Sequence, residues 1–184
     1  MDNTSTTDAR ASTVTRSFRF ETEISSVLEE EAERMGVSVN ALVNIVLKGY
    51  SQFTRYLSKI DMVVINREIL TSLLNCEDEQ TLYDLGTKLG QTVSVDTIMF
   101  WKKDLSEKSV LEYIEKIICR YSQLGTYDEL AQTNGRIVVI RHRLGRKGSR
   151  FLEGYIYSTF KKTIKGSILF EITDSSLKFQ ISYN

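Results

Sequence analysis

The segment that decides the fold is residues 13–53, which read TVTRSFRFETEISSVLEEEAERMGVSVNALVNIVLKGYSQF. Over residues 14–20 apolar and polar side chains alternate, with Phe18 and Phe20 on one side, and this period of two predicts a short strand. A lone strand cannot pair with itself, and the two short helices expected after it cannot enclose a core. We therefore expect this segment to require a second copy of the chain.

Two amphipathic helices are expected after the strand. The first, from about Glu23 to Met35, has apolar residues near a spacing of 3.6, and Gly36 suits its end because glycine adopts positive φ freely. Ser38 is a good N-cap for the second helix. The apolar residues of this second helix are Leu42, Val43, Ile45, Val46, Leu47, Tyr50 and Phe53. A face this wide predicts burial in a four-helix core built by two chains.

The order strand, helix, Gly-Val-Ser-Val-Asn at residues 36–40, and second helix resembles the ribbon-helix-helix DNA-binding domain, the class of the Arc and MetJ repressors. The resemblance covers residues 13–53, roughly the first third of the chain. It implies that the strands of two chains pair into an antiparallel ribbon. Such a ribbon enters the major groove of double-stranded DNA, which is wide enough to admit it. The implied assembly is a homodimer, which a second contact would extend to a tetramer.

In that arrangement the outward side of the ribbon faces the DNA bases. By position, the base-reading residues are Thr15, Ser17 and Arg19, and an arginine can contact guanine with two hydrogen bonds. The first turn of the second helix presents N–H groups that bind phosphate. The phosphate-binding residues would be Ser38, Val39 and Asn40, which position the protein without reading sequence. The structural alternative is an ordinary helical hairpin whose preceding strand joins a larger sheet.

Composition is that of an ordinary soluble globular protein, with 184 residues, 41% hydrophobic, 26% charged and no net charge. No apolar run approaches the roughly 20 residues of a membrane span, so we expect a cytoplasmic protein with no membrane partner. Cys76 and Cys119 make neither a disulfide framework nor a zinc cluster, and both are expected to be buried free thiols. We divide the chain into a disordered arm (1–12), a ribbon-helix-helix domain (13–57) and a second domain (58–184).

The second domain is predicted to be α+β, with a mostly antiparallel sheet covered by helices on one face. One hairpin turns at Asn134–Gly135, a strong hairpin signal, and another turns near Asp174. Helices are expected over 67–74, 77–89, 109–124 and 146–162. Strands are also expected at 62–65, an apolar run, and at 92–100, where the alternation is weaker.

The sequence offers little catalytic chemistry. His142, the only histidine, shares its parity with Val138 and Ile140, which favours a hydrogen-bonded core residue over a haem or metal ligand. Metal-sensing domains need clustered His and Cys ligands, and these are lacking, so no metal or cofactor is expected. No set of nucleophile, base and acid is visible, and an enzyme is unsupported.

Charge is unevenly distributed in the second domain. Residues 136–165 contain nine Lys or Arg and one acid, whereas residues 76–132 contain eleven acids and six Lys or Arg. This predicts either charge complementarity, within or between chains, or an anion site. For an anion site the candidates are Arg146, Lys147 and Arg150, in a glycine-containing loop that leads into a helix. The loop lacks Walker spacing and could equally contact DNA phosphates beside the operator.

Together these features predict a sequence-specific transcriptional regulator that acts as a homodimer or higher oligomer. Its C-terminal domain would oligomerise, sense a small molecule or bind a protein effector. The alternative is an antitoxin-like or scaffold protein whose C-terminal domain binds a protein partner. A third hypothesis, an enzyme in the second domain, would need a ligand pocket to support it.

Overall fold

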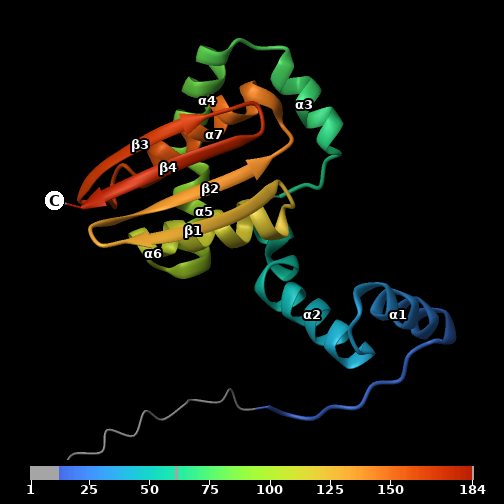
Figure 1. The fold of residues 1–184 in the computed structure, drawn as a ribbon. Helices are drawn as coiled ribbons and strands as arrows, with labels where there is room; N and C mark the ends of the chain where they lie inside the picture. Colours follow the sequence, from blue (N-terminus) through green and yellow to red (C-terminus); the bar gives the residue numbers. More distant parts are fainter. Residues whose placement is uncertain (1–12, 61, 184) are drawn as a thin grey trace, which may run out of the picture. The chain divides into compact units, whose positions relative to one another are not determined.

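The computed structural model describes residues 13–60 and 62–183, which fall into two compact units divided between Lys48 and Gly49 (Figure 1). The division lies within helix α2 and precedes the predicted boundary after residue 57. The disordered arm was predicted for residues 1–12, which lie outside the described residues.

The N-terminal unit contains α1 (Thr22–Met35) and most of α2 (Val39–Gln52), the two helices that were predicted. Gly36, at φ 65°, ends α1, and its N–H contacts the last carbonyls of that helix. Ser38 Oγ accepts a hydrogen bond from the Ala41 N–H at 3.2 Å, which confirms its role as a cap. Residues 13–21 form no strand within the single chain. The strand predicted over 14–20 is therefore absent here, because one copy offers it no neighbouring strand.

The C-terminal unit is mixed helix and sheet, which confirms the α+β class. Its sheet is antiparallel throughout, in the order β1-β2-β4-β3. The strands are β1 (Gly125–Gln132), β2 (Gly135–His142), β3 (Gly166–Ile172) and β4 (Ser176–Tyr183). The helices are η1 (Thr54–Lys59), α3 (Arg67–Asn75), α4 (Glu79–Gln91), α5 (Val93–Lys102), α6 (Glu107–Glu112), the π-helix η2 (Tyr113–Tyr121) and α7 (Gly145–Phe160).

Helices cover one face of this sheet, as predicted (Figure 1). On that face α7 contacts β3 and β4, while η2 contacts β1. The central strands bury alternate residues against these helices: Val138, Ile140, Leu177, Phe179 and Ile181. On the opposite face Leu130 and Leu169 are exposed. The alternation of burial follows from the period of two along each strand.

Glycines allow α4 and α7 to pack at very short range. A Cβ on Gly86 would lie 2.2 Å from the carbonyl oxygen of Phe151, and one on Gly154 would lie 2.2 Å from that of Tyr83. No side chain fits at such a distance, so the two helix backbones approach almost directly. The buried hydroxyls of Tyr113 in η2 and Tyr155 in α7 form a hydrogen bond of 2.7 Å, which connects these two helices.

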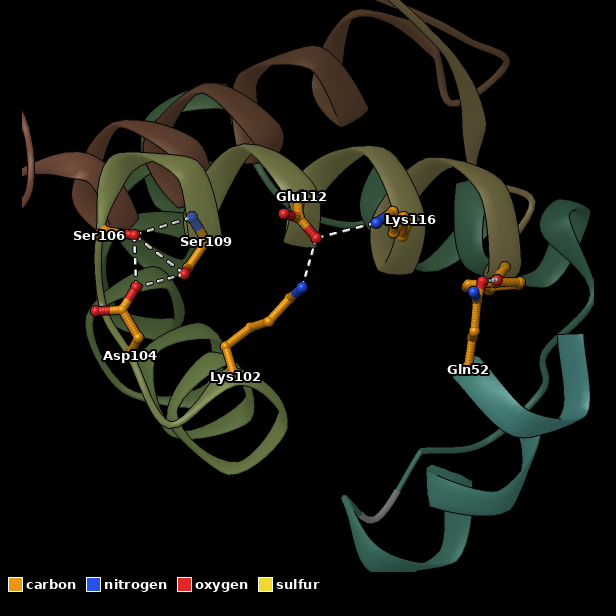
Figure 2. Close-up of polar contacts among 8 residues, drawn as sticks. Gln52, Lys102, Asp104, Ser106, Ser109, Glu112 and Lys116 are labelled. Atoms are coloured by element: carbon orange, nitrogen blue, oxygen red, sulfur yellow. Dashed lines mark hydrogen bonds and ion pairs between the residues drawn. The ribbon is translucent and has the colours of Figure 1, made fainter. Parts of the chain in front are cut away.

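Two carboxylates tie α5, α6 and η2 together (Figure 2). Glu112 accepts hydrogen bonds from Lys102 and from Lys116, and these bonds lower the pKa of its carboxyl group. Asp104 accepts hydrogen bonds from Ser106 at 2.6 Å and from Ser109 at 2.8 Å, which lower its pKa. The connection between α5 and α6 is thus held by side chains at both of its ends.

Two predicted strands are wrong. The apolar run 62–65 has no strand partner, and Val63 and Val64 are 82% and 93% exposed. Residues 92–100 lie mostly in α5 instead, where the buried Ser94 and Ile98 are one helical turn apart. Both parities of that segment are apolar, so alternation could not distinguish a strand from a helix.

Candidate nucleic-acid interface

The N-terminal unit has almost no core of its own. Among its described residues only Ala32 and Leu42 are buried. Nine large apolar side chains of this unit are exposed: Val14, Phe18, Phe20, Ile24, Val27, Met35, Ile45, Val46 and Leu47. So many exposed apolar side chains on one small unit favour an interaction surface.

The predicted base-reading residues lie in the extended segment before α1. Thr15, Ser17 and Arg19 are all exposed, and Phe18 and Phe20 between and beside them stack on each other at 6.3 Å. Within the described residues Arg19 has no ion-pair partner. The structure therefore leaves this arginine available to an external acceptor.

The predicted phosphate-binding residues surround the start of α2. Ser38 is the capping residue, and Val39 and Asn40 begin the helix. The first turn of α2 contains no acidic residue. A helix N-terminus without acidic residues keeps the partial positive charge that favours an anion. The N-terminus of α2 is therefore electrostatically suited to bind a phosphate.

The basic loop predicted as an anion site is occupied by contacts within its own unit. Arg146 pairs with Glu79 at 3.1 Å, and Lys147 donates to the carbonyl of Asn75 at 3.0 Å. Arg150 pairs with Glu153 and lies 4.7 Å from the Tyr83 ring centre. These contacts favour charge complementarity, the alternative interpretation, over an anion site at this loop.

His142 is a core residue, as predicted. It is buried, and its Nδ1 accepts a hydrogen bond from the Leu144 N–H at 3.2 Å. Ser149 Oγ donates to the carbonyl of Thr173 at 2.5 Å and lies 2.9 Å from His142 Nε2, so it accepts the Nε2 proton. Burial lowers the pKa of His142. The imidazole is therefore a neutral structural group with a defined tautomer.

The two cysteines differ from each other. Cys119 is buried as predicted, and burial raises the pKa of its thiol to about 12. Cys76 is exposed, contrary to the prediction, because it caps the end of α3, where its thiol donates to the carbonyl of Ser72. Within residues 13–60 and 62–183, no group of three or more His, Cys, Asp and Glu side chains could hold a metal ion.

Two hollows in the C-terminal unit, which share Arg67, Gln123 and Leu124 in their lining, were not predicted from the sequence. The larger, about 800 Å³, is lined by four arginines: Arg67, Arg120, Arg141 and Arg143. The other, about 610 Å³, is mainly apolar and includes Phe53, Leu57, Met62, Leu70 and Tyr121. The arginines come from α3, η2, β2 and the loop after β2, so no local pattern could have revealed them.

No family model, curated protein or solved structure matches this chain, so its own residues alone bear on its function. None of the described helices combines the length and the apolar character needed to cross a membrane.

Proposed function

We propose that this protein is a sequence-specific DNA-binding transcriptional regulator that acts as a homodimer or higher oligomer. The observation that carries the proposal is the N-terminal unit, in which nine large apolar side chains are exposed and only Ala32 and Leu42 are buried among the described residues. Two helices with such surfaces need a partner, and a second copy supplies the matching surface.

The energetics favour pairing. Burying one large apolar side chain contributes about 1.5–3 kcal/mol, and a two-fold dimer buries the same set from both copies. The extended segment 13–21 has no ladder partner within its chain. An unpaired extended backbone is a template for another strand, so two copies of this segment would form a ribbon across the two-fold axis.

The paired ribbon would expose Thr15, Ser17 and Arg19 on its outer side, with Phe18 and Phe20 turned toward the helices. This alternation supports a reading surface in the major groove. Ser38, Val39 and Asn40 at the start of α2 would hold flanking phosphates. Because the dimer is symmetric, the preferred site should be a palindrome of two half-sites.

The proposal is tested by selecting bound DNA from a random pool at a stated salt concentration and measuring the mass of the free protein in solution. A palindromic consensus and a dimeric mass are expected. A monomer at micromolar concentration, or a pool with no enriched sequence, would refute the proposal.

Arg19→Ala sharpens this test. Loss of a base-reading arginine should cost about 1–3 kcal/mol on the selected site and relax preference at one position. Arg34→Ala is the matched control, because Arg34 is exposed in the same unit but pairs with Glu31 on α1. Equal loss on selected and random DNA would mean that Arg19 contacts only the DNA backbone.

One observation favours the alternative of an antitoxin-like or scaffold protein. In the C-terminal unit Ile69 and Leu73 are exposed one turn apart on α3, and Val63 and Val64 are exposed just before it. An apolar surface of this kind suits a protein partner. Absence of sequence-specific DNA binding, together with retained dimerisation, would favour this alternative.

A further inference from the structure

The arginine-lined hollow lies at a junction of four elements in the C-terminal unit. Arg67 begins α3, Arg120 lies in the last turn of η2, Arg141 belongs to β2, and Arg143 follows β2. The turn between η2 and β1 also lines the hollow, through Gln123 and Leu124. Arg67 is fixed there by a 2.8 Å hydrogen bond from its guanidinium to the carbonyl of Gln123.

The lining of this hollow contains no acidic side chain. Its two other ionisable residues, His142 and Cys119, are uncharged near neutral pH, because burial lowers the pKa of the imidazole and raises that of the thiol. The only carboxylate that pairs with one of the four arginines among the described residues is Asp128, which contacts Arg141. The hollow therefore gathers four arginines, three of which have no carboxylate partner among the described residues.

The pair between Arg141 and Asp128 offers little competition to a ligand. Its side chains are 62% and 60% exposed. Ion pairs as exposed as this one contribute about 0–1 kcal/mol because water and salt screen them. Arg141 can therefore exchange Asp128 for an incoming anion at small cost.

We propose that this hollow binds a small phosphorylated molecule, whose phosphoryl group is held by Arg143 and Arg120, with Arg67 and Arg141 at the edges of the hollow. Guanidinium groups present planar forks of donors that match phosphate oxygens. The volume of about 800 Å³ lies within the roughly 300–1,000 Å³ typical of small-molecule sites.

A purely structural role explains these arginines less well. Arg120 near the end of η2 could stabilise the helix dipole, but this does not account for Arg143, which has no hydrogen-bond or ion-pair partner among the described residues. The basic loop shows the contrast. Arg146 and Lys147 are held by Glu79 and Asn75, whereas Arg120 and Arg143 have no side-chain partner among the described residues.

The turn that lines the hollow is connected to the end of α2 through the contacts of Tyr121. Tyr121, two residues before Gln123, stacks on Phe53 at 4.9 Å and donates a hydrogen bond to Gln52, the last residue of α2. A ligand that orders the turn would thus act on residues that contact α2. Binding itself depends only on the C-terminal unit and not on the DNA-binding proposal.

Titration calorimetry of the full chain with sodium pyrophosphate at low, constant ionic strength tests the site. We expect saturable binding of one pyrophosphate per chain, and thermal unfolding at a higher temperature when pyrophosphate is present. Arg143→Gln should weaken binding about tenfold or more, because it removes charge-assisted hydrogen bonds. It should not lower the unfolding temperature of the free protein, because it relieves repulsion between like charges.

The matched control is Arg146→Gln, which removes a cation from the basic loop instead of the hollow and should leave pyrophosphate binding unchanged. Lack of saturable pyrophosphate binding would overturn the proposal, as would equal weakening by the control. A third outcome also overturns it: Arg143→Gln reduces the salt dependence of DNA binding while pyrophosphate neither binds nor competes. The hollow would then be a contact for DNA phosphates.

Discussion

The two units of this chain bury their apolar residues to very different extents. In the N-terminal unit Leu42 is the only large apolar side chain buried among the described residues, whereas the C-terminal unit encloses a core from Phe53 to Ile181. The amphipathic patterns of the two regions look alike in sequence. The difference shows that a helix with a clear apolar face does not determine whether its partner lies in the same chain.

The two units should also differ in what stabilises them. The C-terminal unit has a sheet that helices cover, so its apolar face is closed by its own elements. The N-terminal unit has two helices and an extended segment, too few elements to form a second layer. Under the proposed dimer we therefore expect its stability to depend on protein concentration, while that of the C-terminal unit should not.

The largest effect is expected from a charge on the exposed face of α2. Val46→Glu should cost a monomer little, since Val46 is exposed there, but it would bury an unpaired carboxylate in a dimer. Burial of such a charge is very unfavourable, so the dimer dissociation constant should rise about 100-fold or more. Sedimentation equilibrium measures this change.

Leu169→Glu is the matched control, because Leu169 is also exposed but lies on the open face of the sheet. It should leave the dimer intact. If Leu169→Glu dissociated the protein and Val46→Glu did not, the sheet and not α2 would form the main contact between copies.

A second substitution tests the closed core of the other unit. Gly86→Ala places a Cβ 2.2 Å from the carbonyl oxygen of Phe151, so α4 and α7 must move apart. Overpacking of this kind typically costs about 1–3 kcal/mol. Chemical denaturation should show this loss, whereas Lys88→Ala, on the exposed side of the same helix, should change the free energy of unfolding by less than about 0.5 kcal/mol. A tolerated Gly86→Ala would mean that the two helices separate easily.

The smallest expected effect is the pH dependence of stability, which should be found in the C-terminal unit because that unit contains His142. Because burial lowers the pKa of His142, the unfolded chain takes up a proton at higher pH than the folded chain. The contribution to stability is complete above about pH 6.5 and is lost as the pH falls through the folded-state pKa. Thermal unfolding of the C-terminal unit should therefore occur at lower temperature near pH 5 than near pH 7.

His142→Gln provides the control for this dependence. His142 is the only histidine in the chain, so the variant should lose the slope of unfolding temperature between pH 5 and 7, even if its stability is lower throughout. An unchanged slope would assign the effect to carboxylates that titrate at lower pH, such as Glu112, whose pKa is lowered by Lys102 and Lys116.

Local signals in the sequence predicted the elements that depend on few neighbouring residues. Gly36 and Ser38 located the turn between α1 and α2, and Asn134–Gly135 located the first hairpin. Capping and tight turns are decided by the φ preference and hydrogen bonds of a few adjacent residues. The strand predicted at 62–65 was wrong because an apolar run does not show whether another strand lies beside it.

The candidate sites also differ in whether local sequence could predict them. Thr15, Ser17 and Arg19 could be chosen from sequence because alternation places them on one side of an extended segment. Arg67, Arg120, Arg141 and Arg143 could not, because they are scattered from residue 67 to residue 143 and meet only at the end of η2. The loop containing Arg146 looked more basic, yet its cations are paired with nearby acceptors.

By itself, the sequence determined most of the helices, both hairpins and the unsatisfied apolar surface of residues 13–53, because periodicity and turn chemistry act between near neighbours. Only the tertiary structure decided that α4 and α7 meet at glycines, that residues 92–100 mostly belong to a helix, and that four distant arginines line one hollow. These outcomes depend on contacts between segments far apart in the chain, where packing overrides local preference.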